Sequence, residues 1–289
     1  MCGLCATVCP RGLDPAALFL SLRRKAPRPP ARLSGLLRHE SVSASALLRL
    51  HLIPPGCRTV FFPGCGLAGT RPATTRRTFE ALSSLVPKLG LVLDCCLRPS
   101  HDTGCSERFS RRFGALTERL HRAGVKRILA ACPGCLSILA QNRKGIAVGT
   151  VYEVLAESPV TRLPDGLPGP FRVHDPCSAR RESGLHEAVR RIVRKSGAGI
   201  VELPRSREKT LCCGKGCGVN DPAAAALIAR EAGGLPIVTY CAGCAEALCA
   251  RHVLDLLFPP AGTAPVFPYP AAYAQRYLLK RRMIRRSRS

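Results

Sequence analysis

Two short stretches of the sequence, "LVLDCC" and "TLCC", each end in a pair of adjacent cysteines. Adjacent side chains of an extended segment point to opposite faces, so such a pair does not form one patch of a hydrophobic core. Further cysteines end the apolar runs "FFPGC", "HDPC", "ACPGC" and "YCAGC". Thiolates placed in this way could bind metal or exchange disulfides.

These cysteines form two sets of five that follow the same order along the chain. Matching members are 112 residues apart at the first cysteine, 117 at the adjacent pair and 109 at the C-x-x-C. This shared register indicates an internal repeat. The first set is Cys65, Cys95, Cys96, Cys132 and Cys135, and the second is Cys177, Cys212, Cys213, Cys241 and Cys244.

The elements that must position the two sets follow the same plan in each half. Each half is predicted to run β-α-β-α-β, which is typical of an α/β fold with parallel strands and helices on the faces of the sheet. Because the carboxyl ends of such strands lie along one edge, five cysteines placed there can converge. The predicted helices carry apolar stripes at Phe79, Leu82, Leu85 and Val86; Leu185, Val189, Ile192 and Val193; and Phe109, Phe113, Leu116 and Leu120. A further helix is predicted to begin at Asp221 and Pro222.

Five convergent thiols exceed the four ligands that close a structural zinc site. Iron–sulfur clusters take thiolate ligands on several iron atoms, so neighbouring cysteines can reach two metals from one loop. This reasoning favours iron–sulfur clusters. Two alternatives stay open: a metal-free dithiol–disulfide oxidoreductase that uses its C-x-x-C pairs, and a zinc-stabilised interaction module.

The words "FFPGC", "HDPC", "LCCG", "ACPGC" and "YCAGC" resemble the CCG, or cysteine-rich, domain over roughly residues 57 to 258. That domain occurs twice in the catalytic subunit of heterodisulfide reductase, and also in iron–sulfur subunits of anaerobic glycerol-3-phosphate dehydrogenase and of glycolate and lactate oxidases. The resemblance implies one or two 4Fe-4S clusters, which are non-cubane in heterodisulfide reductase. It also implies electron transfer between a flavin- or iron–sulfur-containing partner and a disulfide or quinone acceptor.

Two features depart from the pattern of that family. Leu97 follows the first cysteine pair where the family has glycine. The second repeat has 27 residues between Cys213 and Cys241, against 35 between Cys96 and Cys132, so its second helix is predicted to be shorter.

The N-terminus adds Cys2, Cys5 and Cys9, followed by proline. They match the last three cysteines of the ferredoxin run C-x2-C-x2-C-x3-C-P, and we treat them as further metal ligands of an incomplete cluster site. A truncated start is our hypothesis for the missing ligands. The expected organisation is a ferredoxin-type segment (1–20), a Pro/Arg-rich linker with a helix (21–56), CCG repeat 1 (57–160), CCG repeat 2 (168–258) and a basic C-terminal tail (259–289).

Composition places the chain in a reducing compartment. It has 17 cysteines, an odd number, and no secretory leader at its N-terminus, so a cytoplasmic protein is expected. The net charge is +25, of which +19 remains without the last ten residues. Because this charge is dispersed and aromatic residues are only 5%, nucleic-acid binding is not expected. An acidic redox partner or an anionic membrane surface fits the charge better, the latter through the C-terminal tail as an interfacial helix or a disordered segment.

Other motifs carry weaker signals. "GCGLAG", with Asp94 downstream, fits a dinucleotide fingerprint, but the second repeat does not keep it. His101 and His174 lie beside cysteines, where a cluster contact competes with an ordinary turn histidine. No arrangement of catalytic side chains stands out. The remaining cysteines, Cys57, Cys105 and Cys249, are expected to be ordinary thiols, and Cys217 a minor ligand candidate.

Overall fold

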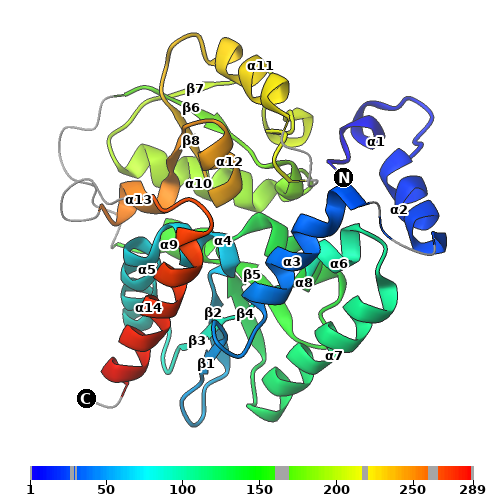
Figure 1. Cartoon of the computed structure of the whole chain (residues 1–289). Helices are drawn as coiled ribbons and strands as arrows, with labels where there is room; N and C mark the ends of the chain where they lie inside the picture. Colours follow the sequence, from blue (N-terminus) through cyan, green and yellow to red (C-terminus); the bar gives the residue numbers. More distant parts are fainter. Residues whose placement is uncertain are drawn as a thin grey trace.

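The strands of the protein form two sheets, one for each half of the chain (Figure 1). A computed structural model describes residues 2–26, 29, 31–159, 169–216, 221–259 and 266–287. The first sheet has the order β1-β3-β2-β4-β5, and the second has the order β7-β6-β8-β9. The strands are β1 Leu50–Leu52, β2 Thr59–Phe62, β3 Gly90–Leu93, β4 Arg127–Ala130, β5 Ala147–Thr150, β6 Phe171–His174, β7 Ile200–Glu202, β8 Ile237–Thr239 and β9 Arg251–His252.

Three strands of each half are arranged in the same order. β3-β2-β4 in the first sheet corresponds to β7-β6-β8 in the second, and all of these pairs are parallel. The predicted α/β fold with two tandem parallel repeats is therefore confirmed. Strand β1, which comes from the segment 21–56, pairs antiparallel with β3 and extends the edge of the first sheet.

The helices of the two repeats follow the predicted plan. The stripe of α7 is buried at all four predicted positions, and so is that of α10. Asp221 caps α11 by accepting from the N–H groups of Ala223 and Ala224. As predicted, α11 is the shorter second helix, with 11 residues against 17 in α7. The helices are α4 Gly64–Thr70, α5 Pro72–Leu85, α6 Arg98–Asp102, α7 Ser106–Arg122, α8 Pro133–Gln141, α9 Val151–Glu157, α10 Ser183–Lys195, α11 Pro222–Ala232, α12 Ala242–Ala247 and α13 Val253–Leu257.

The two ends of the chain form helices outside the repeats. The linker helix is α3, but it lies upstream of the apolar patch "ASALLRLHLI", which instead forms turns and strand β1. The C-terminal segment forms α14, whose Leu279 and Met283 are buried and which packs on α4 and α5. The terminal elements are α1 Leu4–Val8, α2 Pro15–Lys25, η1 Ala31–Leu33, α3 Ser34–Ser43 and α14 Ala271–Arg286, and the 3-10 turns of repeat 2 are η2 Cys177–Ala179 and η3 Arg207–Lys209.

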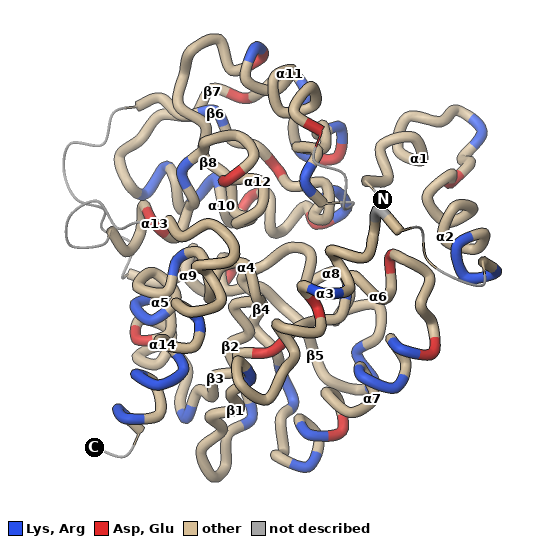
Figure 2. The backbone as a smooth tube through the Cα atoms, in the orientation of Figure 1, with Lys and Arg blue, Asp and Glu red and all other residues tan. Residues whose placement is uncertain are grey.

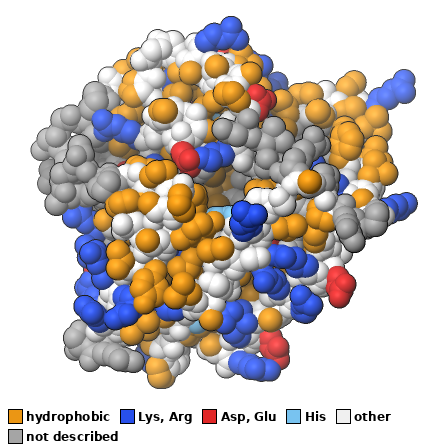
Figure 3. Space-filling model, in the orientation of Figure 1, with side chains coloured by type: hydrophobic (Ala, Val, Ile, Leu, Met, Phe, Trp, Pro, Cys, Tyr) orange, Lys and Arg blue, Asp and Glu red, His pale blue; other side chains and the backbone are white. Residues whose placement is uncertain are grey.

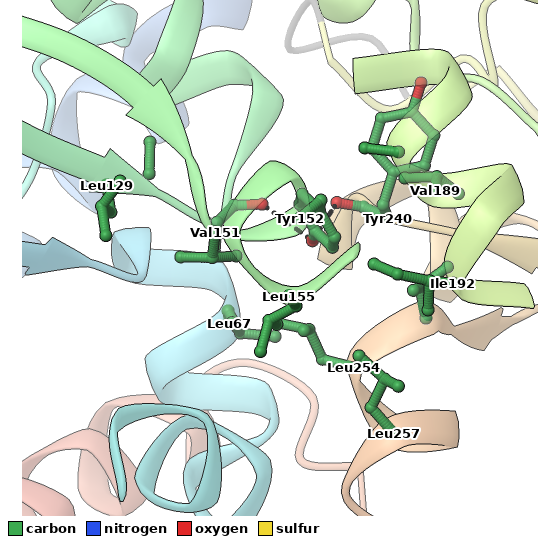
Figure 4. Close-up of a cluster of buried hydrophobic side chains, with 14 of the residues drawn as sticks. Leu67, Leu129, Val151, Tyr152, Leu155, Val189, Ile192, Tyr240, Leu254 and Leu257 are labelled. Atoms are coloured by element: carbon green, nitrogen blue, oxygen red, sulfur yellow. Dashed lines mark hydrogen bonds between the residues drawn. The ribbon is translucent and has the colours of Figure 1, made fainter. Parts of the chain in front are cut away.

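One hydrophobic core runs through both repeats (Figure 4). It joins Leu129 and Leu155 of the first half to Val189 and Leu254 of the second, and α9 packs directly on α10. Burial of a large aliphatic side chain contributes about 1.5–3 kcal/mol, so this shared core fixes one repeat against the other. The edges of the two sheets that carry cysteines are held in register as a result.

Lys and Arg are spread along both halves of the described chain and along α14 (Figure 2). Apolar side chains gather over α1 and α2 on the face shown in Figure 3, where Leu18, Phe19 and Leu22 are each more than half exposed. Among the helices described, none has the length and apolar character needed to cross a bilayer.

Candidate metal centre

The first cysteine of repeat 1 lies at the start of a helix. The segment "GCGLAG" forms most of α4, and Cys65 occupies the first turn of this helix directly after β2. Gly64 has φ +80°, and a Cβ there would lie 3.0 Å from both Cys132 Cβ and Cys135 Sγ. Only glycine therefore lets this turn lie against the C-x-x-C of the same repeat.

The glycines of α4 serve helix packing and leave the dinucleotide alternative without support. A Cβ on Gly66 would lie 3.4 Å from Ala242 Cβ, and one on Gly69 would lie 2.9 Å from the Ala272 carbonyl oxygen. Asp94, the expected ribose partner, instead accepts hydrogen bonds from His51 and from the N–H of Cys95 at 2.8 Å each.

The adjacent cysteines of each repeat are held by the residue that follows them. Leu97 has φ +63° and donates its N–H to Cys95 Sγ at 3.4 Å. Gly214 has φ +84° and donates its N–H to Cys212 Sγ at the same distance. Leu97 thus adopts the left-handed conformation that glycine takes more readily. Although leucine replaces glycine in repeat 1, the left-handed backbone and the N–H contact with the cysteine sulfur are the same in both repeats.

The second cysteine pair does not lie at the end of a strand, contrary to the sequence analysis. β7 ends at Glu202, and a segment containing η3 leads from there to Cys212. This segment is anchored because Thr210 donates to the Asp175 carbonyl oxygen at 2.7 Å and Arg180 donates to the Thr210 carbonyl oxygen at 2.7 Å. Hydrogen bonds from side chains therefore position the second cysteine pair, as a strand positions the first pair in repeat 1.

Asp175 is the centre of that anchor. Its carboxylate accepts from Arg190 at 2.9 and 3.0 Å, from Tyr240 at 2.9 Å and from the Arg207 N–H at 2.7 Å. Burial alone would raise the pKa of Asp175, but the hydrogen bonds and charge of Arg190 lower it below its ordinary value. The buried pair of Asp175 and Arg190 is therefore ionised and fixes the loop that carries the second cysteine pair.

The two C-x-x-C turns are tied together by one tyrosine. Cys132 precedes α8 and Cys241 precedes α12, each as the N-cap residue. The Tyr152 hydroxyl lies 2.9 Å from the Ala131 carbonyl oxygen and 3.1 Å from that of Tyr240, the residues just before the two turns. Figure 4 shows Tyr152 between the two repeats. One hydroxyl hydrogen thus bridges the carbonyl groups that introduce both turns.

All ten predicted repeat cysteines come together in one unbroken series. Each thiol interacts with the next across both repeats, with Cys132 and Cys241 as the junction. Sulfur atoms lie 3.2 Å apart at Cys213 and Cys244 and 3.9 Å apart at Cys177 and Cys212. The order of the series is Cys65, Cys95, Cys96, Cys135, Cys132, Cys241, Cys244, Cys213, Cys212 and Cys177.

A cavity of about 210 Å³ lies against this series. Nine of the ten cysteines line it, and Cys212 stands behind Cys177 and Cys213. The wall is completed by side chains of three other elements, His39 of α3, Arg23 of α2 and Arg98 of α6. The cysteine edges of the two repeats therefore face one shared space.

Thiolate and thiol character alternate along much of the series. The hydrogen bond from Cys95 lowers the pKa of Cys65, and the bond from Cys135 lowers that of Cys96. Hydrogen bonds from Cys177 and then Cys213 lower the pKa of Cys212 to about 2. The pKa of Cys95 is raised by its bonds to Cys65 and Cys96 and by burial. Crowded sulfur atoms cannot all ionise unless cations compensate them, and metal ions would supply that charge.

The donor set fits a polynuclear sulfur-bridged group better than a single ion. A single zinc ion takes four ligands, whereas nine of the ten cysteines line the same cavity. The sulfur atoms are distributed around a cavity, which is the arrangement that several irons sharing thiolates require. Cysteine is the soft ligand that iron–sulfur clusters use, so the residues present fit such a group.

The N-terminal cysteines stay apart from the series in the described structure. Cys5 is exposed on α1, and none of the three has a sulfur contact with the ten repeat cysteines among the interactions of the described residues. Cys2 is nearest, since its carbonyl oxygen accepts from Arg180 at 3.0 Å and it shares a surface pocket with Cys177. The prediction that these three bind metal stays a prediction.

The remaining cysteines lie elsewhere, and the two flagged histidines differ. Cys57 is buried and donates to the Thr59 carbonyl oxygen at 3.1 Å, and Cys249 is exposed. His101 lies in helix α6, not in a turn as expected, and bonds Asp102 at 2.9 Å. His174 is buried, and neither ring nitrogen has a partner in the part of the chain that is described. Cys105 precedes α7, and Cys217 lies outside the described residues.

Sequence reasoning missed His39. Its Nε2 lies 3.3 Å from Cys65 Sγ, and its Nδ1 lies 2.8 Å from the Tyr273 hydroxyl of α14. Tyr269 packs edge-on against the His39 ring at 5.0 Å. Nothing in the local sequence marks this histidine, because its partners come from segments 26 and 234 residues away.

Comparison with known proteins finds the same two repeats. The family model described as "CCG: Cysteine-rich domain" matches residues 59–140 and 171–248, the two repeats. Over 261 residues the chain is 25% identical to a subunit of the "Dihydromethanophenazine:CoB--CoM heterodisulfide reductase" of Methanosarcina barkeri, covering 76% of this chain and 61% of that protein.

Two further relatives are similar to this chain. A subunit of the "Fumarate reductase (CoM/CoB)" of Methanothermobacter marburgensis is 28% identical over 248 residues, which cover 76% of this chain and 48% of that protein. "EtfAB:quinone oxidoreductase" of Syntrophomonas wolfei is 24% identical over 159 residues, which cover 50% of this chain and 22% of that protein. The chain therefore spans less than two thirds of the length of each of these relatives.

Proposed function

The chain belongs to the CCG cysteine-rich domain family, and from that premise we propose that it is an iron–sulfur electron-transfer subunit of an oxidoreductase. The observation that carries the proposal is the unbroken series of ten thiols, nine of which line one cavity. Clusters bound there would supply one-electron redox chemistry. The similarity to proteins of reductases and of a quinone oxidoreductase supports the same class of activity.

The cysteines of each repeat would hold one group of 4Fe-4S type. Cys132 and Cys241 are hydrogen-bonded across the boundary between the repeats, so they would lie between the two bound groups. The α9–α10 contact and the Tyr152 bridge keep that spacing fixed. A fixed, short separation is what electron transfer between two centres needs. The groups proposed here include clusters of the non-cubane kind.

Electrons would pass between a flavin- or iron–sulfur-containing partner and a disulfide or quinone acceptor. Support comes from the names of the relatives, which include a heterodisulfide reductase and a quinone oxidoreductase. The exposed apolar side chains of α1 and α2, beside Cys2, Cys5 and Cys9, are the surface we assign to the partner. We place the protein in the cytoplasm, with the basic face of α14 as a contact for an anionic membrane surface; nucleic acid is not an expected partner.

The C-x-x-C of repeat 1 does not have the properties that the dithiol alternative requires. An attacking cysteine needs a lowered pKa and access to solvent. Cys135 is buried, and its bonds to Cys132 and Cys96 together with burial raise its pKa. The bond from Cys135 lowers the pKa of Cys132, but the bond with Cys241 and burial outweigh it and raise that pKa overall.

Anaerobic purification followed by iron, acid-labile sulfide and zinc analysis tests the proposal. We expect iron and sulfide in comparable amounts and an electron paramagnetic resonance signal after dithionite reduction. The matched variants are Cys135→Ser, inside the series, and Cys105→Ser, outside it. The first should lose iron and the second should not. Zinc without sulfide would support the interaction module, and the absence of both metals would support the dithiol enzyme; either result refutes the proposal.

A further inference from the structure

Arg276 of α14 is a buried cation without a counter-ion in the described structure. Its side chain is among the largest fully buried ones, with 1% of the residue exposed. None of its three guanidinium nitrogens has a hydrogen-bond partner among the described residues. Burying an unpaired charge is costly, so such a group is normally retained where an anion completes it.

The packing of α14 places Arg276 beside the first cysteine of repeat 1. Ala272, one turn before it, packs so closely on Gly69 of α4 that a Cβ on Gly69 would lie 2.9 Å from the Ala272 carbonyl oxygen. Tyr273 reaches His39 at 2.8 Å, and His39 reaches Cys65 at 3.3 Å. The same helix face therefore approaches the start of α4, where Cys65 lies.

Arg276 lies on the face of α14 that packs against α4, whose first turn carries Cys65. The charge of Arg276 also acts on Tyr269 and Tyr273. Among the described residues, no carboxylate pairs with its guanidinium.

The other cation near the cysteines is treated differently. Arg98 of α6 lies in the wall of the shared cavity, against Gly134 of repeat 1 and with Cys177 of repeat 2 in the same wall, but its guanidinium pairs with Asp102 at 2.9 Å. The positive charge near Cys177 is therefore compensated within the protein, whereas that of Arg276 near Cys65 is not. This difference makes the surroundings of the two repeats electrostatically unequal.

We infer that Arg276 is the counter-ion for an anionic group held by the repeat 1 cysteines, and that it makes this site the easier of the two to reduce. The inference rests on the proposed function. One-electron reduction adds one negative charge, taken from the external reductant, and Arg276 stays protonated throughout while no bond forms or breaks. A fixed buried cation favours the state with the extra negative charge. Electrons shared by the two sites would then rest preferentially in repeat 1.

The test is an anaerobic potentiometric titration of the full chain, followed by electron paramagnetic resonance. Arg276→Met removes the charge and keeps much of the length, Arg276→Lys keeps the charge, and Arg282→Met makes the same change at an exposed position of the same helix. The repeat 1 signal is assigned by its loss in Cys65→Ser. We expect Arg276→Met to weaken reduction of that signal at least tenfold, a shift of about 59 mV for one electron. Arg276→Lys should recover most of the shift, and Arg282→Met should cause none.

Iron and sulfide are measured in every sample, so failure of the proposed function, with no cluster in the wild type, is distinguished from failure of this inference. An unchanged potential in Arg276→Met at wild-type iron content overturns it. If Arg276→Met folds but loses iron, Arg276→Lys decides: retained iron and potential support the counter-ion, and loss of both refutes it. In cluster-free protein, Arg276→Met should unfold at the same temperature as the wild type or higher. A clear decrease there would mean that Arg276 stabilises the fold by itself, against the inference.

Discussion

Replacing Tyr152 with phenylalanine tests whether the two C-x-x-C turns are tied together by one hydroxyl. Tyr152 is 1% exposed, and burial raises its pKa well above the ordinary value, so the hydroxyl remains a donor at neutral pH. The substitution removes the contacts of 2.9 and 3.1 Å to Ala131 and Tyr240 and leaves the ring in place. Removing a donor from buried carbonyl groups costs about 1–3 kcal/mol.

Anaerobic denaturant titration of cluster-free protein would measure this free energy of unfolding. Tyr277→Phe is the matched control, because Tyr277 lies on the outer part of α14. Among the described residues, its hydroxyl takes part in one hydrogen bond, which it accepts from Arg281 at 3.1 Å. We expect the control to stay within about 0.5 kcal/mol of wild type, as surface substitutions do. If Tyr152→Phe were equally silent, the hydroxyl would not join the repeats, and our account of their fixed spacing would be wrong.

Further predictions concern the loop of the second cysteine pair. Gly214→Ala should destabilise the protein by about 2–4 kcal/mol, since it adds left-handed strain and steric overlap with the Asp221 carbonyl oxygen. Calorimetry checks this against Gly216→Ala, whose Cβ would meet nothing within 4 Å. Because the pKa of Asp175 is lowered from 3.8, its stabilising contribution is complete above that pH and is lost as the pH falls through the lower folded value. Denaturation of cluster-free protein at a series of acidic pH values should show this loss, and Asp175→Asn should flatten the dependence; an unchanged slope would contradict it.

The repeat architecture was predictable because its signals are local. Apolar stripes and the Asp221–Pro222 start identify helices from neighbouring residues, and the cysteine spacing reveals the duplication. The parallel strand order then follows from how β-α-β units connect. Leu97 shows the limit of this reasoning: its left-handed conformation is set by the cysteine turn and not by the propensity of leucine.

The residues that surround the cysteines were not predictable, because their partners are distant in the chain. His39 reaches Cys65 only after α3 folds over the first repeat, and the helix that carries Arg276 comes near only after α14 packs on α4. The apolar patch at 44–53 has no periodicity that separates a helix from a short edge strand, and pairing with β3 decides the outcome. Similarly, the second cysteine pair is positioned by Asp175 and Thr210 and not by a strand.

Diffraction from anaerobically grown crystals at the iron absorption edge is the most direct test of the central claim. The account predicts anomalous peaks in two groups inside the cavity, one bonded to the cysteines of each repeat and the two adjacent at Cys132 and Cys241. Iron found only elsewhere, or a lone zinc peak bound by four of the ten sulfur atoms, would contradict it.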